Sequence, residues 1–139
     1  MEDPCYIEPL ALKDALLTRE SGFVVIDVRD SDWAGGNIRG SVNFPSALPM
    51  WTIEGGKNEN DLRQFVTTFL ERGETVIFHC LKSQVRGPAC AKSFVQVARS
   101  ILAAGGHKGG APKVMVLKGG YEEFCRQFKD DEHTLFENT

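Results

Sequence analysis

The chain has 139 residues, of which 42% are hydrophobic and 25% are charged, and its formal net charge is −3 at pH 7. This length suits one domain with a core of its own, and the composition is ordinary for a soluble globular protein. The negative net charge argues against general nucleic-acid binding, which favours basic surfaces. A site for an anion would therefore have to be built locally in this chain.

The sequence carries no signal for a membrane or for secretion. No stretch approaches the roughly 20 apolar residues of a membrane span, and residues 1–7 lack the apolar region of a secretory signal. We therefore expect a cytoplasmic protein with free thiols rather than disulfides. The cysteines include no Cys-x-x-Cys pair of the kind that binds zinc, so we expect no metal. They are Cys5, Cys80, Cys90 and Cys125.

The first part of the chain predicts one helix followed by two strands. Leucines at helical spacing indicate a helix that is opened by Pro9 and closed near Gly22. Residues 23–27 form a continuous apolar run, which is typical of a buried central strand. Residues 41–44 predict a second, weaker strand, and the stretch 46–58 is the least regular part of the sequence.

The middle of the chain predicts a helix, a strand and a longer helix. Apolar residues at helical spacing indicate a helix that is capped by Asn60 and ended by Gly73. Residues 75–78 read as another buried strand. The longer helix is expected to begin at about Gly87, with a proline in its first turn, and to end at the glycine pair 105–106.

The last part of the chain completes an α/β pattern. Residues 107–112 are expected to be a flexible connection, residues 114–117 the last core strand, and residues 121–128 a short final helix. Strands that alternate with helices imply one α/β domain over residues 1–139, with a mostly parallel sheet that has helices on both faces. Ligands in such folds bind at the carboxyl ends of the strands.

One segment at such a strand end points to chemistry. In His79-Cys-Leu-Lys-Ser-Gln-Val-Arg86-Gly-Pro, five residues separate Cys80 from Arg86 between a strand and a helix. Such a loop can turn its backbone N–H groups inward and, with the helix N-terminus, bind an anion. Arg86 adds a planar fork of donors that fits two oxygens. The same positive field favours thiolate over thiol at Cys80.

We therefore predict Cys80 and Arg86 as the catalytic residues, with Cys80 as the nucleophile. Ser83 would donate a hydrogen bond to the sulfur and help it to leave. A bare Cys-x5-Arg pattern also occurs by chance, so a purely structural loop is the alternative. The residues predicted to bind the substrate are Leu81, Lys82, Ser83, Gln84, Val85 and Arg86.

The loop resembles the active-site loop of the rhodanese/Cdc25-phosphatase superfamily. Two further segments are similar to motifs of that superfamily: Ile26-Asp-Val-Arg29 together with residues 36–45, and Leu117-Lys-Gly-Gly-Tyr121. The motifs occur in the right order within residues 23–128. Asn37 stands where the superfamily usually has histidine, and we expect little consequence for the chemistry. The resemblance implies a single rhodanese-like domain.

Loop length divides the chemistry in this superfamily. Sulfur-transferring rhodaneses have a loop one residue shorter, whereas the longer loop goes with phosphate or arsenate. The chain looks most like the Acr2-type arsenate/antimonate reductases and their small Cdc25-like relatives. This resemblance implies a cytoplasmic enzyme that acts on a small oxyanion, holds no cofactor, and uses glutathione and its protein partner glutaredoxin as reductants.

A small Cdc25-like phosphatase is the main alternative. Val85 stands where Cdc25 phosphatases tend to carry a glutamate, and a phosphatase needs a proton donor for its leaving group. Asp30, Asp32 and Glu54 are candidates for this donor by position only. Arsenate reduction makes less demand on a placed acid, which favours the reductase. A non-catalytic binding module and a persulfide sulfurtransferase are the remaining alternatives.

Several other conspicuous residues have a structural interpretation that we prefer. Asp27 and Arg29 are expected to form an ion pair rather than to touch the reaction, and Cys90 is expected to be an ordinary buried cysteine rather than a resolving thiol. The glycine tract 105–110 lacks the strand-before, helix-after context of a phosphate loop. Structural or solvent-exposed roles are also expected for His79, Lys82, Lys118, Trp33, Trp51, Phe44, Cys5 and Cys125.

Overall fold

A computed structural model describes residues 1–18, 21–51, 59–105, 111–130 and 135–137. Its centre is a five-stranded sheet in the order β1-β6-β5-β2-β4, and each neighbouring pair of strands in it is parallel. The expected α/β fold with a mostly parallel sheet is confirmed. The strands are β1 (Cys5–Ile7), β2 (Phe23–Asp27), β4 (Val42–Asn43), β5 (Thr75–His79) and β6 (Val114–Leu117).

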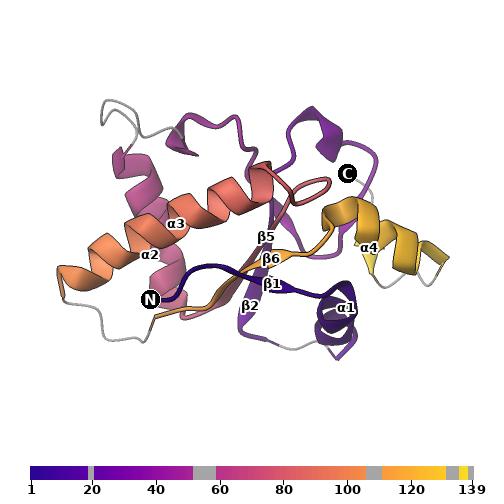
Figure 1. Ribbon diagram of the computed structural model, residues 1–139, viewed down its shortest axis with the longest axis horizontal. Coiled ribbons are helices and arrows are strands. Elements are labelled where there is room, and N and C mark those ends of the chain that lie inside the picture. The colour runs from indigo at the N-terminus through magenta and orange to yellow at the C-terminus, as the bar shows by residue number, and fades with distance from the viewer. Residues whose placement is uncertain (19–20, 52–58, 106–110, 131–134, 138–139) are drawn as a thin grey trace.

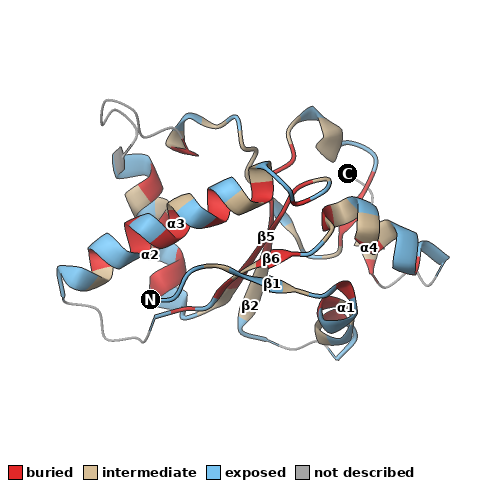
Figure 2. Ribbon diagram, in the orientation of Figure 1, coloured by how far each residue is buried: buried red, intermediate tan, exposed pale blue. Residues whose placement is uncertain are grey.

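Helices cover both faces of the sheet, as Figure 1 shows. On one side lie α2 (Glu59–Arg72) and α3 (Arg86–Ala103), and on the other lie α1 (Pro9–Leu17) and α4 (Gly120–Phe128). Each side has its own hydrophobic cluster. The helices turn their buried residues toward the sheet and their exposed residues outward (Figure 2). None of the helices in the described residues is long and apolar enough to cross a membrane.

The packing of the central strand β5 explains the apolar run in its middle, residues 76–78. Val76 and Phe78 belong to the cluster beneath α2 and α3, whereas Ile77 belongs to the cluster beneath α1 and α4. Successive side chains of a strand point to opposite faces, so a strand that is covered on both faces needs apolar residues at every position. β5 lies between β2 and β6, and its carboxyl end therefore opens at the middle of the sheet edge.

Most of the predicted elements are confirmed, and the differences have local reasons. The sequence did not predict β1, a short edge strand, or the small antiparallel pair of β3 (Asn37–Ile38) and β7 (Phe136–Glu137). Asn60 does not cap α2, because the helix has already begun at Glu59. Two short 3-10 turns, Ser31–Trp33 and Pro49–Trp51, occupy stretches without periodicity. Residues 52–58 and 106–110, parts of the predicted irregular stretches, lie outside the described residues.

A buried ion pair follows the end of β2, as expected. Arg29 donates from Nε to both carboxylate oxygens of Asp27 at 3.1 and 2.9 Å, and its Nη2 lies 2.8 Å from Oδ2. The same guanidinium donates to the carbonyls of Asp32 at 3.1 Å and Gly36 at 2.8 Å, and it lies 4.0 Å from the ring centroid of Tyr121. One buried side chain thus fixes the turn between β2 and β3.

The ion pair leads to a stability prediction. Asp27→Asn would leave the buried charge of Arg29 without its counter-ion, and we expect it to lower the free energy of unfolding by about 3–5 kcal/mol, measured by urea denaturation. The matched control is Asp3→Asn, which removes an exposed partner of Arg99 and is expected to leave the midpoint unchanged. Equal midpoints for the two variants would contradict the assigned role of the pair.

Candidate active site

Cys80 lies directly after the central strand, where the carboxyl end of β5 meets the N-terminus of α3. Its side chain is 3% exposed. Figure 1 shows the loop between β5 and α3 at the carboxyl edge of the sheet, near the segment that follows β2. The sequence predicted a ligand site at this edge, and the structure places the Cys80–Arg86 loop there.

Main-chain groups of the loop converge on the sulfur. The N–H groups of Ser83 and Gly87 donate to the Sγ atom of Cys80 at 3.2 and 3.3 Å. Ser83 has a φ of +53°, a left-handed conformation that few residues other than glycine adopt. Its hydroxyl accepts a hydrogen bond from the Cys80 N–H at 3.4 Å. The expected bond from the Ser83 hydroxyl to the sulfur is therefore replaced by one from the Ser83 amide.

Other N–H groups of the loop have no protein partner. Among the residues that the structure describes, none accepts a hydrogen bond from the main-chain N–H of Leu81, Lys82, Gln84 or Val85. The side chains of Lys82, Gln84 and Val85 are exposed, and that of Val85 reaches 74%. An anion at this loop would therefore be held by backbone amides, as in other concave anion sites, rather than by these side chains.

Helix α4 holds the back of the loop. The N–H groups of Tyr121 and Glu122 donate to the carbonyls of Cys80 and Leu81 at 3.0 and 2.9 Å. Gly120 has a φ of +64°, and a Cβ atom at this position would lie 2.5 Å from the Leu81 carbonyl oxygen. The motif Leu117-Lys-Gly-Gly-Tyr121 thus has a physical role, because only glycine allows this close approach to the loop.

Arg86 is bound by two carboxylates. Its Nη1 donates to Asp30 Oδ2 at 3.2 Å and to Asp32 Oδ1 at 2.9 Å, and its Nη2 donates to Asp32 Oδ2 at 2.8 Å. The hydrogen bond from Arg86 lowers the pKa of Asp32 to about 2. Hydrogen bonds from Ser46, Ala47 and Arg86 outweigh the opposing effect of burial and lower the pKa of Asp30. Both acids are therefore ionised at neutral pH.

Two of the three candidate proton donors, Asp30 and Asp32, are ionised partners of Arg86 and not acids. Asp30 and Asp32 do reach the loop, but as partners of Arg86, and an ionised carboxylate has no proton to give. Glu54, the third candidate, lies outside the described residues. The pairing of the acids with Arg86 is a feature that sequence reasoning missed. Their positions, one and three residues after Arg29, were visible in the sequence, but nothing there indicated that the side chain of Arg86 would point toward them.

His79 and Cys90 lie close to Cys80, and burial shifts the pKa of both. His79 is fully buried on the Asp27 side, with Nδ1 3.1 Å from the Cys80 carbonyl. Burial lowers the pKa of His79, although the charge of Asp27 acts in the opposite direction, and His79 is therefore neutral. Burial, with a smaller effect of the Cys80 charge, raises the pKa of Cys90 to about 12. Both residues fit the structural roles expected for them, since neither presents a reactive ionised group.

The remaining conspicuous residues lie away from the loop or pack in the core. Phe44 and Trp51 contact Phe65 in the cluster beneath α2. Lys118 forms an exposed pair with Glu8. Asn37 donates to Ser41 and Glu137 rather than to the loop, which agrees with the small effect expected for the missing histidine. The other residues with a preferred structural role are Cys5, which is exposed, and Cys125 and Trp33, which are partly buried.

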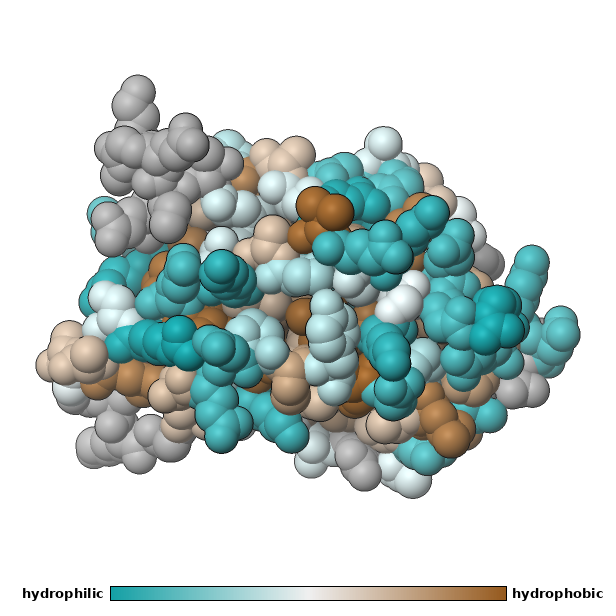
Figure 3. Space-filling view, in the orientation of Figure 1, coloured by the Kyte–Doolittle hydropathy of each residue, from teal (hydrophilic) through white to brown (hydrophobic). Residues whose placement is uncertain are grey.

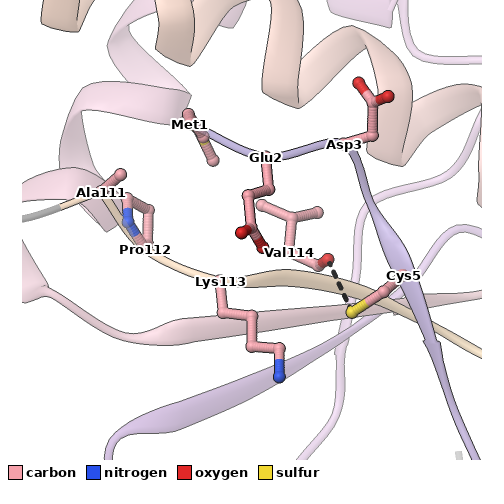
Figure 4. A pocket seen from close by; sticks show the side chains of 8 residues that line it. All are labelled: Met1, Glu2, Asp3, Cys5, Ala111, Pro112, Lys113 and Val114. Atoms are coloured by element: carbon pink, nitrogen blue, oxygen red, sulfur yellow. Dashed lines mark hydrogen bonds between the residues drawn. The ribbon is translucent and has the colours of Figure 1, made fainter.

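A hollow of about 490 Å³ lies at the opposite, amino-terminal edge of the sheet (Figure 4). It is lined by residues 1–3, Cys5 and residues 111–114, and Cys5 Sγ there contacts the Val114 carbonyl at 4.0 Å.

The face shown in Figure 3 is mostly hydrophilic, with hydrophobic residues in small groups. No three His, Cys, Asp or Glu residues of the described ranges are grouped so as to hold a metal ion.

Comparisons with known proteins agree with this architecture. The model of the rhodanese-like domain family matches residues 10–127. The structure is similar to that of the As-Sb reductase from Leishmania major, with a TM-score of 0.80 and 29% identity over 97% of this chain and 86% of that one. The CDC25-like phosphatase YCH1 of Saccharomyces cerevisiae is 30% identical over 94% of this chain and 84% of that protein. Arsenate reductase 2.1 of Oryza sativa subsp. japonica is 34% identical over 70% of this chain and 52% of that protein.

The close contact at Gly120 gives a test of the loop. We expect Gly120→Ala to displace the Cys80 and Leu81 carbonyls and to change the rate at which iodoacetamide alkylates Cys80, followed by peptide mass spectrometry. Gly73→Ala is the matched control, because Gly73 has a φ of +66° with no neighbour within 4 Å of an added Cβ. Both variants lose stability through the left-handed φ, by about 1–2 kcal/mol. The same alkylation rate in both would refute the support of the loop by α4.

Proposed function

This chain belongs to the rhodanese-like domain family, and within that family we propose that it is a thiol-dependent reductase of arsenate. Its relatives are an arsenate reductase and Cdc25-type phosphatases, so it is an enzyme of a family with thiol-based chemistry. The observation that carries the proposal is the loop itself. Two amides hold the sulfur of Cys80, while four further amides of the loop have no acceptor among the residues that the structure describes and can donate to an oxyanion.

The substrate would bind on Arg86 and on the amides of Leu81, Lys82, Gln84 and Val85. Each loop N–H that lacks a protein partner can donate to an oxygen of a tetrahedral anion, and the N-terminus of α3 adds a favourable dipole. Arg86 supplies charge-assisted donors. The buried sulfur of Cys80 lies at the base of this loop. The nucleophile and the arsenic atom would thereby be held close together, and such proximity lowers the barrier of the reaction.

The proposed reaction has three steps. The Cys80 thiolate attacks arsenic, an S–As bond forms, and an As–O bond breaks; the leaving hydroxyl takes a proton from solvent and departs as water. A glutathione thiolate then attacks the Cys80 sulfur and forms an S–S bond. The electron pair of the S–As bond stays on arsenic, which is reduced from the pentavalent to the trivalent state and leaves as arsenite. A glutaredoxin thiolate finally attacks the glutathione sulfur of the mixed disulfide, so that a glutaredoxin–glutathione disulfide forms and the Cys80 thiolate is released. Antimonate would follow the same course.

An external reductant is part of the proposal because the chain offers no second thiolate at the site. Cys90, the nearest candidate along the sequence, is buried with a pKa of about 12. Glutathione and glutaredoxin are the expected partners, and the cytoplasm is the expected location since both act there. The similarity to the Leishmania major As-Sb reductase and to the rice arsenate reductase supports this choice.

Phosphatase activity is the second candidate function. The loop would bind a phosphoryl group as it binds arsenate, and relatives of similar length include Dual specificity phosphatase ibp1 of Schizosaccharomyces pombe, which is 29% identical over 88% of this chain. A phosphatase also needs a proton for the leaving alkoxide. The two carboxyl groups beside the loop are ionised, and this favours the reductase. We expect aryl phosphate hydrolysis to be a weak side activity.

The decisive test compares wild type with Cys80→Ser in two assays. One assay follows arsenate-dependent NADPH oxidation with glutathione, glutaredoxin and glutathione reductase, and the other follows the hydrolysis of an aryl phosphate. Cys80→Ser is expected to lose arsenate turnover to background, because the hydroxyl is a far weaker nucleophile than a thiolate. Cys5→Ser, at an exposed cysteine far from the loop, is expected to keep wild-type turnover.

Each alternative has its own outcome in these assays. Strong hydrolysis without arsenate turnover would assign the chain as a small Cdc25-like phosphatase. Arsenate turnover that survives in Cys80→Ser would refute the proposed mechanism. A wild-type chain that is silent in both assays would point to a non-catalytic module, and a persulfide on Cys80 after incubation with thiosulfate would point to sulfur transfer.

A further inference from the structure

The guanidinium of Arg86 has one occupied edge and one free edge. An arginine carries five N–H donors. The two donors of Nη1 and one of Nη2 are used by Asp30 and Asp32. Among the described residues, none accepts a hydrogen bond from the Nε–H or from the second Nη2–H. These two donors lie in the guanidinium plane along the same edge, and such a fork fits two oxygens of a tetrahedral anion.

The two carboxylates are themselves held in place. Asp30 accepts hydrogen bonds from the Ser46 hydroxyl at 2.7 Å and from the Ala47 N–H at 2.9 Å. Asp32 accepts from the Asp30 N–H at 2.9 Å, and its carbonyl accepts from the buried Arg29 at 3.1 Å. A contact that has formed by chance at the surface needs no such support. A side chain that must be held in a productive geometry does need it.

We propose that Asp30 and Asp32 are positioning residues, which hold the Nη1 side of Arg86 so that its Nε and Nη2 edge stays free for the oxyanion. The proposal rests on the proposed function, in which the loop binds an oxyanion, and it adds two residues that determine affinity. An arginine that is not held gives up its rotamer freedom at the moment of binding. In this chain Asp30 and Asp32 would already restrict the rotamers of Arg86 before the anion binds, so less conformational entropy is lost on binding.

Charge alone predicts the opposite effect. A carboxylate next to an anion site repels the anion, so removal of Asp32 would tighten binding if Asp32 acted through its charge. Removal would also tighten binding if Asp32 competed with the anion for Arg86. The positioning role predicts weaker binding when Asp32 is removed. The sign of the change therefore separates positioning from both simpler interpretations.

The test measures inorganic phosphate binding to the full chain by phosphorus NMR, which reads weak affinities, in a Cys80→Ser background that prevents turnover. Asp32→Ala is expected to weaken phosphate binding about tenfold, which corresponds to about 1.4 kcal/mol. Asp32→Asn keeps one oxygen for Arg86 and is expected to lose less. Unchanged or tighter binding in Asp32→Ala would overturn the proposal. Urea denaturation checks that each variant is folded. If an Asp32 variant does not fold, Asp30→Ala takes its place and is also expected to weaken phosphate binding.

A double-mutant cycle shows whether the effect acts through Arg86. In an Arg86→Ala background, Asp32→Ala is expected to cause no further weakening, since the side chain that Asp32 positions is gone. An equal loss in both backgrounds would indicate a general structural effect and overturn the proposal. Glu8→Gln is the charge control, because it removes one exposed carboxylate that is paired with Lys118 rather than with Arg86. It is expected not to weaken binding.

The failure of this proposal differs from the failure of the proposed function. If the parent Cys80→Ser variant binds no phosphate, the oxyanion site and the positioning role are both refuted. If the parent binds phosphate and the wild type reduces arsenate, but Asp32→Ala binds phosphate as tightly as the parent, only the positioning role is refuted.

Discussion

Two hydrogen bonds between α4 and the back of the Cys80 loop determine the rest of the site. The carbonyls of Cys80 and Leu81 accept from the first amides of α4, and a peptide whose carbonyl points backward has its N–H directed forward. The contact depends on Gly120, where a side chain would collide with both carbonyls. A loop of five residues with free amides would be unstable by itself, and here a neighbouring helix supports it.

The second support is the buried guanidinium of Arg29, which links the sheet to the surface turn. It neutralises Asp27 at the end of β2 and holds the carbonyl of Asp32. Asp32 in turn binds Arg86 at the start of α3. The two arginines thus differ in their surroundings. Arg29 is buried and paired with Asp27, whereas Arg86 is about one-third exposed and has two donors without an acceptor among the described residues.

The sequence predicted the elements that depend on local pattern. The apolar runs at 23–27 and 114–117 and the helical spacing before Gly73 correspond closely to β2, β6 and α2. Burial of a strand on both faces leaves a continuous apolar run, and burial of one face of a helix leaves a period of about 3.6 residues. It also predicted Cys80 at a strand end. The elements that it missed, β1 and the β3–β7 pair, have two or three residues each and are formed by partners far along the chain.

The site was predictable in its residue types but not in its contacts. The direction of a long side chain depends on tertiary neighbours, so the pairing of Arg86 with Asp30 and Asp32 could not be read from their positions. The same holds for Ser83, where a left-handed φ gives the sulfur an amide instead of a hydroxyl. Backbone conformations of this kind are set by the packing around a loop and leave no period in the sequence.

The burial of Cys90 has a consequence for how the turnover rate of such an enzyme would depend on thiols in the cell. With a pKa of about 12, Cys90 supplies no resolving thiolate beside Cys80, so in the proposed reaction a thiol from solution has to open the adduct directly. Under the proposed reaction, the rate would then follow the redox poise of the surrounding thiol pool. A cell that lacks reduced glutaredoxin would stall the enzyme at its mixed disulfide, a form in which Cys80 is shielded from irreversible oxidation.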